Sequence, residues 1–212
     1  MPKVVDPERR RNAIADALFD VLREGGFANV TLASVAERAG LAIGSVRHFL
    51  GTREEMLRFA FDAIADRVHR RVTARAEAVL ASLDDTRLGA DDRLEATADL
   101  LCELLPLDAT RRDEAIVWIE FETAARTDAQ LAGTSRRAAA RAARLVETVL
   151  ESIQRRRAIP SPFDLPTETA RLSALIDGLT LHCALHPDIV GPDMARRAVT
   201  AHLRELGRRH SS

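Results

Sequence analysis

Apolar residues recur at a helical spacing of three and four positions along almost the whole chain, and no long segment alternates as a half-buried strand would. This pattern predicts an all-α protein. Pro7 suits the first turn of a helix, and Gly25 and Gly26 suit its C-terminus, so these residues bound one predicted helix. Asp6 is the expected N-cap of that helix.

The segments that follow differ in length. Thr31 is expected to cap a short second helix that closes at Gly40. A short third segment has Val46, Phe49 and Leu50 on one apolar face, and these three are expected in the core. Thr52 and Glu55 have the spacing of a capping box, so a long fourth helix should begin there and end near residues 84–85. Further helices are expected at about 91–105, 112–127, 134–157, 167–186 and 192–208, with Pro160, Pro162 and Pro166 in a linker, which gives about nine to ten helices. We therefore expect an N-terminal domain at 1–52 and a helical body at 53–212.

Composition narrows the possible classes of protein. Of the 212 residues, 46% are hydrophobic and 30% are charged, as in a globular protein. No apolar run reaches the roughly 20 residues of a membrane-spanning helix, and the N-terminus lacks a secretory signal, so a cytoplasmic protein without membrane contact is expected. The sequence has no nucleophile elbow, phosphate loop, dinucleotide-binding glycine run or zinc-ligand set, so we expect no enzyme and no cofactor. An all-helical enzyme, or a ligand-binding helical protein without DNA affinity, is the alternative.

The segment from Thr31 to Leu50 has the order short helix, tight turn, short helix, which is typical of a DNA-binding helix-turn-helix and also of a plain packing module. Gly40 in the turn can adopt positive φ, and Leu41 can fill the gap between the two helices. The formal net charge of the whole chain is −1, and residues 1–53 carry eight basic against six acidic side chains. Any positive charge that serves DNA binding must therefore be local.

Residues 11–56 resemble the N-terminal domain of the TetR family of transcription regulators along its whole length. The matching positions are Ile14, Ala17, Leu18, Glu24, Gly25, Phe27, Thr31, Leu32, Val35, Ala36, Ala39, Gly40, Leu41, Gly44, Ser45, His48, Phe49, Leu50, Arg53, Glu54 and Met56. The resemblance implies a DNA-binding head and a C-terminal ligand-binding and dimerisation domain. The implied partners are double-stranded operator DNA, a second copy of the chain and a small-molecule effector. Repression relieved by the effector is the expected output, and activation stays open.

The resemblance also implies roles for single residues. Those expected to contact DNA are Thr31 and Arg53 at phosphates and Ile43, Ser45, Arg47 and His48 in the major groove. Ala42 stands where a serine usually caps the recognition helix, so that helix should start without a side-chain cap. Arg47 replaces a common tyrosine and could contact a phosphate or bind guanine with two hydrogen bonds. Residues 9–11 are three arginines that could either follow phosphates or form a solvated tail.

The stretches VWIEFETAARTDAQL and LIDGLTLHCALHP resemble the C-terminal domains of the BetI-type subgroup of the family. Because the helix at 167–186 is apolar on nearly every face, it is expected to lie between its own core and a partner. The resemblance implies that this helix and the helix at 134–157 of each subunit form a four-helix dimer interface. The expected interface residues are Leu145, Val149, Leu172, Ile176, Leu179 and Cys183. The expected effector pocket draws on Phe59, Cys102, Trp118, Phe121, Glu122, Leu179 and His182, each of which could instead be core. With one tryptophan and no tyrosine, the chain is not expected to build an aromatic cage for choline.

His182 and His186 lie four residues apart, at the spacing with which two histidines can share a metal ion. No third ligand follows at a fixed spacing, so no metal site is expected and interfacial histidines are favoured. Cys102 and Cys183 cannot make a disulfide framework, and both are expected to be buried thiols.

Overall fold

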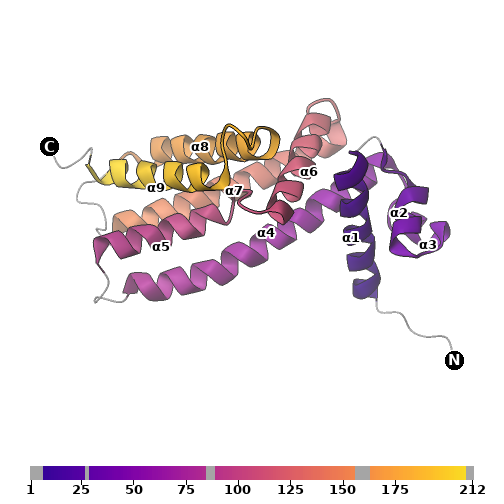
Figure 1. Cartoon of the computed structure of the whole chain (residues 1–212), viewed down its shortest axis with the longest axis horizontal. Coiled ribbons are helices and arrows are strands. Elements are labelled where there is room, and N and C mark those ends of the chain that lie inside the picture. The colour runs from indigo at the N-terminus through magenta and orange to yellow at the C-terminus, as the bar shows by residue number, and fades with distance from the viewer. Residues whose placement is uncertain (1–6, 27–28, 85–88, 156–162, 209–212) are drawn as a thin grey trace. The chain divides into compact units, whose positions relative to one another are not determined.

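The computed structural model describes residues 7–26, 29–84, 89–155 and 163–208. These residues form helices and short connections, without a strand, which confirms the all-α prediction (Figure 1). The helices are α1 (Pro7–Gly25), α2 (Leu32–Ala39), α3 (Ile43–Arg47), α4 (Arg53–Asp84), α5 (Ala90–Cys102), α6 (Ala109–Ala125), α7 (Ala129–Arg155), α8 (Leu165–Leu185) and α9 (Pro192–Arg208). None of the described helices is both long enough and apolar enough to cross a bilayer.

Local capping chemistry sets several of these boundaries. The side chain of Thr31 accepts a hydrogen bond from the backbone N–H of Ser34 at 3.0 Å, which caps α2. Gly40 follows α2 with φ +63°, a left-handed conformation that favours glycine. At the start of α4 the backbone N–H of Thr52 donates to Glu55 at 2.8 Å while the N–H of Glu55 donates to the Thr52 hydroxyl at 3.2 Å, as the capping box predicts.

The starts of α7 and α8 differ from the sequence predictions. α7 begins at Ala129 rather than near residue 134, because the Asp128 carboxylate accepts from the backbone N–H of Gln130 at 2.7 Å and can start the helix there. α8 begins at Leu165, so Pro166 lies in its first turn rather than in the linker, and Asp164 caps it. Asp6, Pro160 and Pro162 lie outside the described residues.

By its contacts the chain divides into two compact units. The first comprises residues 1–66 and 116–135, and the second comprises residues 67–115 and 136–212. The division into these compact units therefore runs inside α4. The reason is visible in the first unit, where Phe61 of α4 stacks on Phe121 of α6 with ring centroids 3.9 Å apart, so part of α6 joins the N-terminal helices.

The first unit has its own core and its own polar clamp. Side chains of α1, α2 and the α3 region are fully or almost fully buried there, namely Ile14, Leu18, Val35, Val46 and Leu50. On the surface, Arg38 of α2 makes a two-pronged hydrogen bond to the Glu24 carboxylate of α1, with its Nη1 donating at 2.8 Å. Apolar burial and this clamp together fix α2 on α1.

The second unit is a bundle of α5, α7, α8 and α9 with the later part of α4. Its core includes Leu101, Leu150, Leu172, Val199 and Leu203, each at most 2% exposed. Ion pairs link the helices at the edge of this core: Asp99 of α5 pairs with Arg75 of α4 and Arg196 of α9. Another arginine of α4, Arg71, donates to the buried Glu114 of α6 at 2.8 Å.

Candidate nucleic-acid interface

The helix-turn-helix is held by a turn and two buried anchors. After Gly40, the backbone N–H of Leu41 donates to the carbonyl of Ala36 at 2.9 Å, which closes the C-terminus of α2. Val46 within α3 and Leu50 just after it are both 0% exposed, as the sequence predicts for core residues. α3 is therefore pinned along one side and presents its other side outward.

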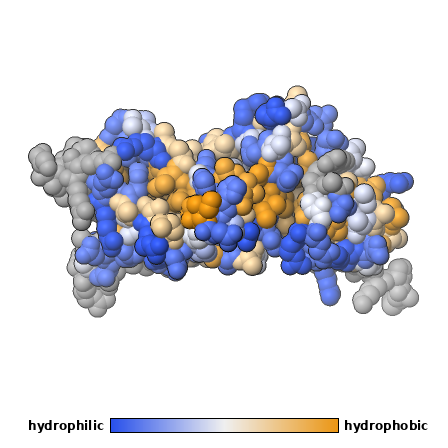
Figure 2. Space-filling model, turned by 45° about the horizontal axis from the view of Figure 1, so that its top comes forward, coloured by the Kyte–Doolittle hydropathy of each residue, from blue (hydrophilic) through white to orange (hydrophobic). Residues whose placement is uncertain are grey.

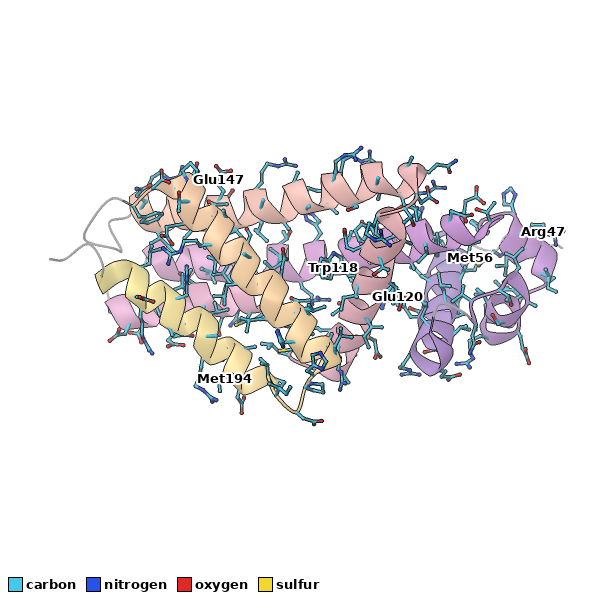
Figure 3. The ribbon with its side chains drawn as sticks, turned by 90° about the horizontal axis from the view of Figure 1, so that it is seen from above. Arg47, Met56, Trp118, Glu120, Glu147 and Met194 are labelled. Carbon is cyan, nitrogen blue, oxygen red and sulfur yellow. The ribbon has the colours of Figure 1, made fainter. Side chains whose placement is uncertain are left out.

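The residues expected to read DNA lie on that outward side. Ile43 is 47% exposed at the start of α3, Arg47 and His48 are exposed at its end, and Ser45 is half-buried between them. Arg47 extends away from the helices of the first unit (Figure 3). Among the described side chains no acidic group lies within ion-pair distance of its guanidinium, so none of them neutralises this charge.

Two features of α3 bear on its chemistry. Ala42 precedes the helix and makes no side-chain cap, as the sequence predicts. α3 ends at Arg47, so Phe49, which the sequence placed on its apolar face, follows the helix and is half-buried. The His48 ring meets the Phe49 ring edge-on, with centroids 5.4 Å apart, and His48 nevertheless stays exposed. This packing orients the imidazole without removing it from the surface.

The two residues expected at phosphates differ in what the structure describes. Thr31 is exposed, and its hydroxyl is engaged with Ser34, to whose side chain it donates at 3.0 Å. Thr31 therefore caps α2, and its side chain stays exposed to solvent. The side chain of Arg53 lies outside the described part of the chain.

Some charged side chains of the first unit are paired with one another. The hydrogen bond from Arg38 lowers the pKa of the Glu24 carboxyl and raises that of Arg38 itself. Arg23 pairs with Asp20 at 3.2 Å. Arg11 is not part of a free tail: it lies in α1 with its guanidinium 5.3 Å from the centroid of the Phe59 ring.

The residues expected to line an effector pocket fall into both units. Phe59, Trp118, Phe121 and Glu122 belong to the first unit, and Cys102, Leu179 and His182 belong to the second. Phe121 is 0% exposed against Phe61, and Glu122 accepts a hydrogen bond from Ser135 at 2.7 Å. Cys102 is 3% exposed, and desolvation raises the pKa of its thiol to about 11. His182 is exposed, which separates it from the buried members of the set.

Four of the six residues expected at a dimer interface are buried within the single chain. Leu172, Ile176, Cys183 and Val149 are 0%, 6%, 3% and 7% exposed, and they lie in the core of the second unit. Leu145 and Leu179 pack against the same core and are partly buried. A side chain without accessible surface offers nothing to a partner, so the apolar stripe chosen from the sequence is the inward face of α8. This helix is apolar on so many faces that its sequence did not distinguish inside from outside.

A different set of apolar side chains is exposed. Leu181, Leu185, Ile189 and Met194 are 42%, 48%, 72% and 49% exposed, and they follow one another from the end of α8 to the start of α9. Hydrophobic side chains gather among hydrophilic ones on the face over these helices (Figure 2). Leu181 and Leu185 lie one helical turn apart, a signal that the sequence carried and that the inward stripe obscured. No group of three or more potential metal ligands occurs among the described residues.

Comparisons with known proteins agree with this architecture. The family model of the C-terminal domain of BetI-type transcriptional repressors matches residues 90–208. The chain is 29% identical over 206 residues to the HTH-type transcriptional regulator PksA of Bacillus subtilis (strain 168), covering 97% of this chain and 94% of that protein. The crystal structure of a transcriptional regulator from Rhodococcus sp. Rha1 has a TM-score of 0.74 at 28% identity and covers 95% of this chain and 98% of its own.

A regulator from Saccharomonospora viridis, solved in complex with choline, shares the fold with a TM-score of 0.70 at 20% identity, covering 93% of this chain and 96% of its own. The family match extends over more than half of the chain, and the head has the helix-turn-helix geometry described above. The chain therefore belongs to the TetR family of helix-turn-helix transcription regulators, with a C-terminal domain of the BetI type.

Proposed function

We propose that this regulator is a repressor that binds a palindromic operator as a homodimer and leaves it when a small molecule binds the helical body. The observation that carries the proposal is the outward side of α3, where Ile43, Arg47 and His48 are exposed while Val46 and Leu50 anchor the helix. To read base edges in a major groove, a helix needs a firmly anchored backbone and exposed side chains that offer both polar and apolar groups.

Arg47 is the proposed specificity residue of this surface. Its planar guanidinium can donate two hydrogen bonds to O6 and N7 of a guanine, or one charge-assisted pair to a phosphate. Ile43 can contact a thymine methyl group, and Ser45 and His48 can bond to base edges. Thr31 and Arg53 are proposed phosphate contacts that set the register of the head on the duplex.

A dimer follows from how little one head can read. Two recognition helices spaced about 34–36 Å apart, or a multiple of that, read both halves of a palindrome. We propose that the second copy covers the exposed apolar face formed by Leu181, Leu185, Ile189 and Met194, and we name this set the α8–α9 face. Apolar surface rimmed by polar residues is typical of such interfaces.

The effector is proposed to act by shifting a population between two arrangements of the dimer, of which one has its heads at operator spacing. α4 runs from the first unit into the second and is the proposed connection. Choline, the molecule bound in the Saccharomonospora viridis structure, is a poor candidate for this chain, because one tryptophan and no tyrosine are available for a cage. Trp118 and Glu122 stay proposed pocket residues, and the proposed location is the cytoplasm, where operator DNA lies.

The test is selection of bound fragments from a pool of genomic DNA. A single enriched palindrome would support the proposal and supply the operator. No enrichment by a folded protein would contradict it and return the chain to the class of helical ligand-binding proteins without DNA affinity.

A further inference from the structure

The last turn of α8 carries two histidines that the DNA-reading role does not use. His182 and His186 are both exposed, and their ring centroids lie 5.9 Å apart with a 53° angle between the ring planes. The backbone N–H of His186 donates to the carbonyl of His182 at 2.7 Å, so the helical spacing persists to the second histidine. The two imidazoles therefore stand one above the other on one side of the helix end.

This arrangement has the geometry of a chelating pair. Histidines four residues apart on a helix bind zinc together in metalloprotease helices. Two imidazoles that bind one zinc ion through nitrogens at about 2.1 Å have ring centroids roughly 5 Å apart. The observed separation of 5.9 Å is close to that value, so the two rings are near enough to share one ion once their side chains rotate to face it.

The charges near the pair are of both signs. The pair lies at the C-terminus of α8, where the helix dipole gives a partial negative charge, and the guanidinium of Arg112, which donates to the Ala184 carbonyl at 3.2 Å, partly offsets it. Asp188 follows two residues after His186 and is exposed. Cys183, the thiol closest in sequence to His182, is 3% exposed and lies in the core, which leaves the imidazoles as the ligands.

The pair also adjoins the α8–α9 face. His182 follows Leu181 and His186 follows Leu185, and both leucines belong to that face. A single chain supplies two protein ligands here, and no described group supplies three. A two-fold interface repeats every residue of the face, so a second copy brings a second pair to the same interface.

We infer that His182 and His186 form a site for a divalent transition metal ion of the zinc class, completed by the same pair of a second copy. The inference rests on the proposed dimer. Four imidazoles suit a tetrahedral zinc ion, so the ion ties the two copies together and makes dimer affinity depend on the metal.

The experiment uses the tag-free full-length chain and two readouts. Competition for Zn²⁺ against a chromophoric chelator measures metal binding, and sedimentation equilibrium with and without Zn²⁺ measures the dimer dissociation constant. The variants are His182→Ala and His186→Ala, with His69→Ala as the matched control, because His69 is an exposed histidine of α4 in the same unit. Circular dichroism shows that each variant is folded.

We expect Zn²⁺ to tighten the wild-type dimer at least tenfold. Each of the two variants should lose at least tenfold in zinc affinity and all of the zinc effect on the dimer, while the control stays within twofold of wild type. Zinc binding that both variants retain overturns the site. Zinc binding by the pair without any change in the dimer constant overturns the shared coordination. A dimer that forms without zinc and binds none overturns the inference and leaves the proposed function intact, whereas a chain that stays monomeric at all concentrations and zinc levels contradicts both.

Discussion

Replacing Leu181 and Leu185 with serine should break the homodimer while leaving the fold of each subunit intact. Full burial of a leucine side chain is worth about 1.5–3 kcal/mol. These two side chains are 42% and 48% exposed in the single chain, so covering what remains is worth about 1 kcal/mol for each. Both copies contribute these two leucines to a two-fold interface, so the double substitution removes about 4 kcal/mol of association free energy. This loss corresponds to a roughly thousandfold rise in the dimer dissociation constant.

Sedimentation velocity over a range of concentrations measures this change. Ile43→Ser is the matched control, because Ile43 is an aliphatic side chain with 47% exposure that belongs to the other unit. The control should dimerise as the wild type does. A dimer constant that the double substitution leaves unchanged, with circular dichroism showing a folded chain, would refute the assignment of the α8–α9 face.

Three further predictions concern the fold and its ionisable groups. Phe121→Ala should lower the free energy of unfolding by about 3–5 kcal/mol in a urea titration, because Phe121 is 0% exposed and stacks on Phe61. Phe59→Ala changes a half-buried side chain and should lower this free energy clearly less. Cys102 should resist a thiol reagent at pH 8 in the native protein and react after unfolding, because burial raises its pKa to about 11 and keeps it protonated; fast native labelling at this position would contradict its burial. The pKa of the Glu24 carboxyl is lowered in the folded state, so its contribution to stability is present above the unfolded pKa and disappears as the pH falls through the folded pKa. The difference in melting temperature between wild type and Glu24→Gln should therefore shrink between about pH 7 and pH 3. A difference that stays constant over this range would argue against the Arg38–Glu24 pair.

The sequence predicted best those features that depend on neighbouring residues. The Thr31 cap, the left-handed Gly40 and the reciprocal hydrogen bonds of Thr52 and Glu55 are all as expected, because each is decided within five residues of the chain. The missing cap at Ala42 was predictable for the same reason. The start of α7 was missed because the capping role of Asp128 went unrecognised.

Features that depend on tertiary packing were harder to predict. α8 is apolar on most faces, so the inward Leu172 and Ile176 could not be told from the outward Leu181 by periodicity. The inclusion of part of α6 in the first unit depends on the stacking of Phe61 on Phe121, two residues far apart in the sequence. Sequence patterns contain no information on which of two apolar faces a distant helix will cover.

The most direct test of the central claim, that α3 reads operator DNA, is the affinity of Arg47→Ala for the enriched duplex. Fluorescence anisotropy across a salt series should show a loss of about 1–3 kcal/mol, or roughly 5- to 150-fold, relative to wild type. Arg141→Ala removes an exposed arginine of α7 in the other unit and should bind within twofold of wild type. Equal affinity of Arg47→Ala and wild type at every salt concentration would contradict the claim that this surface reads DNA.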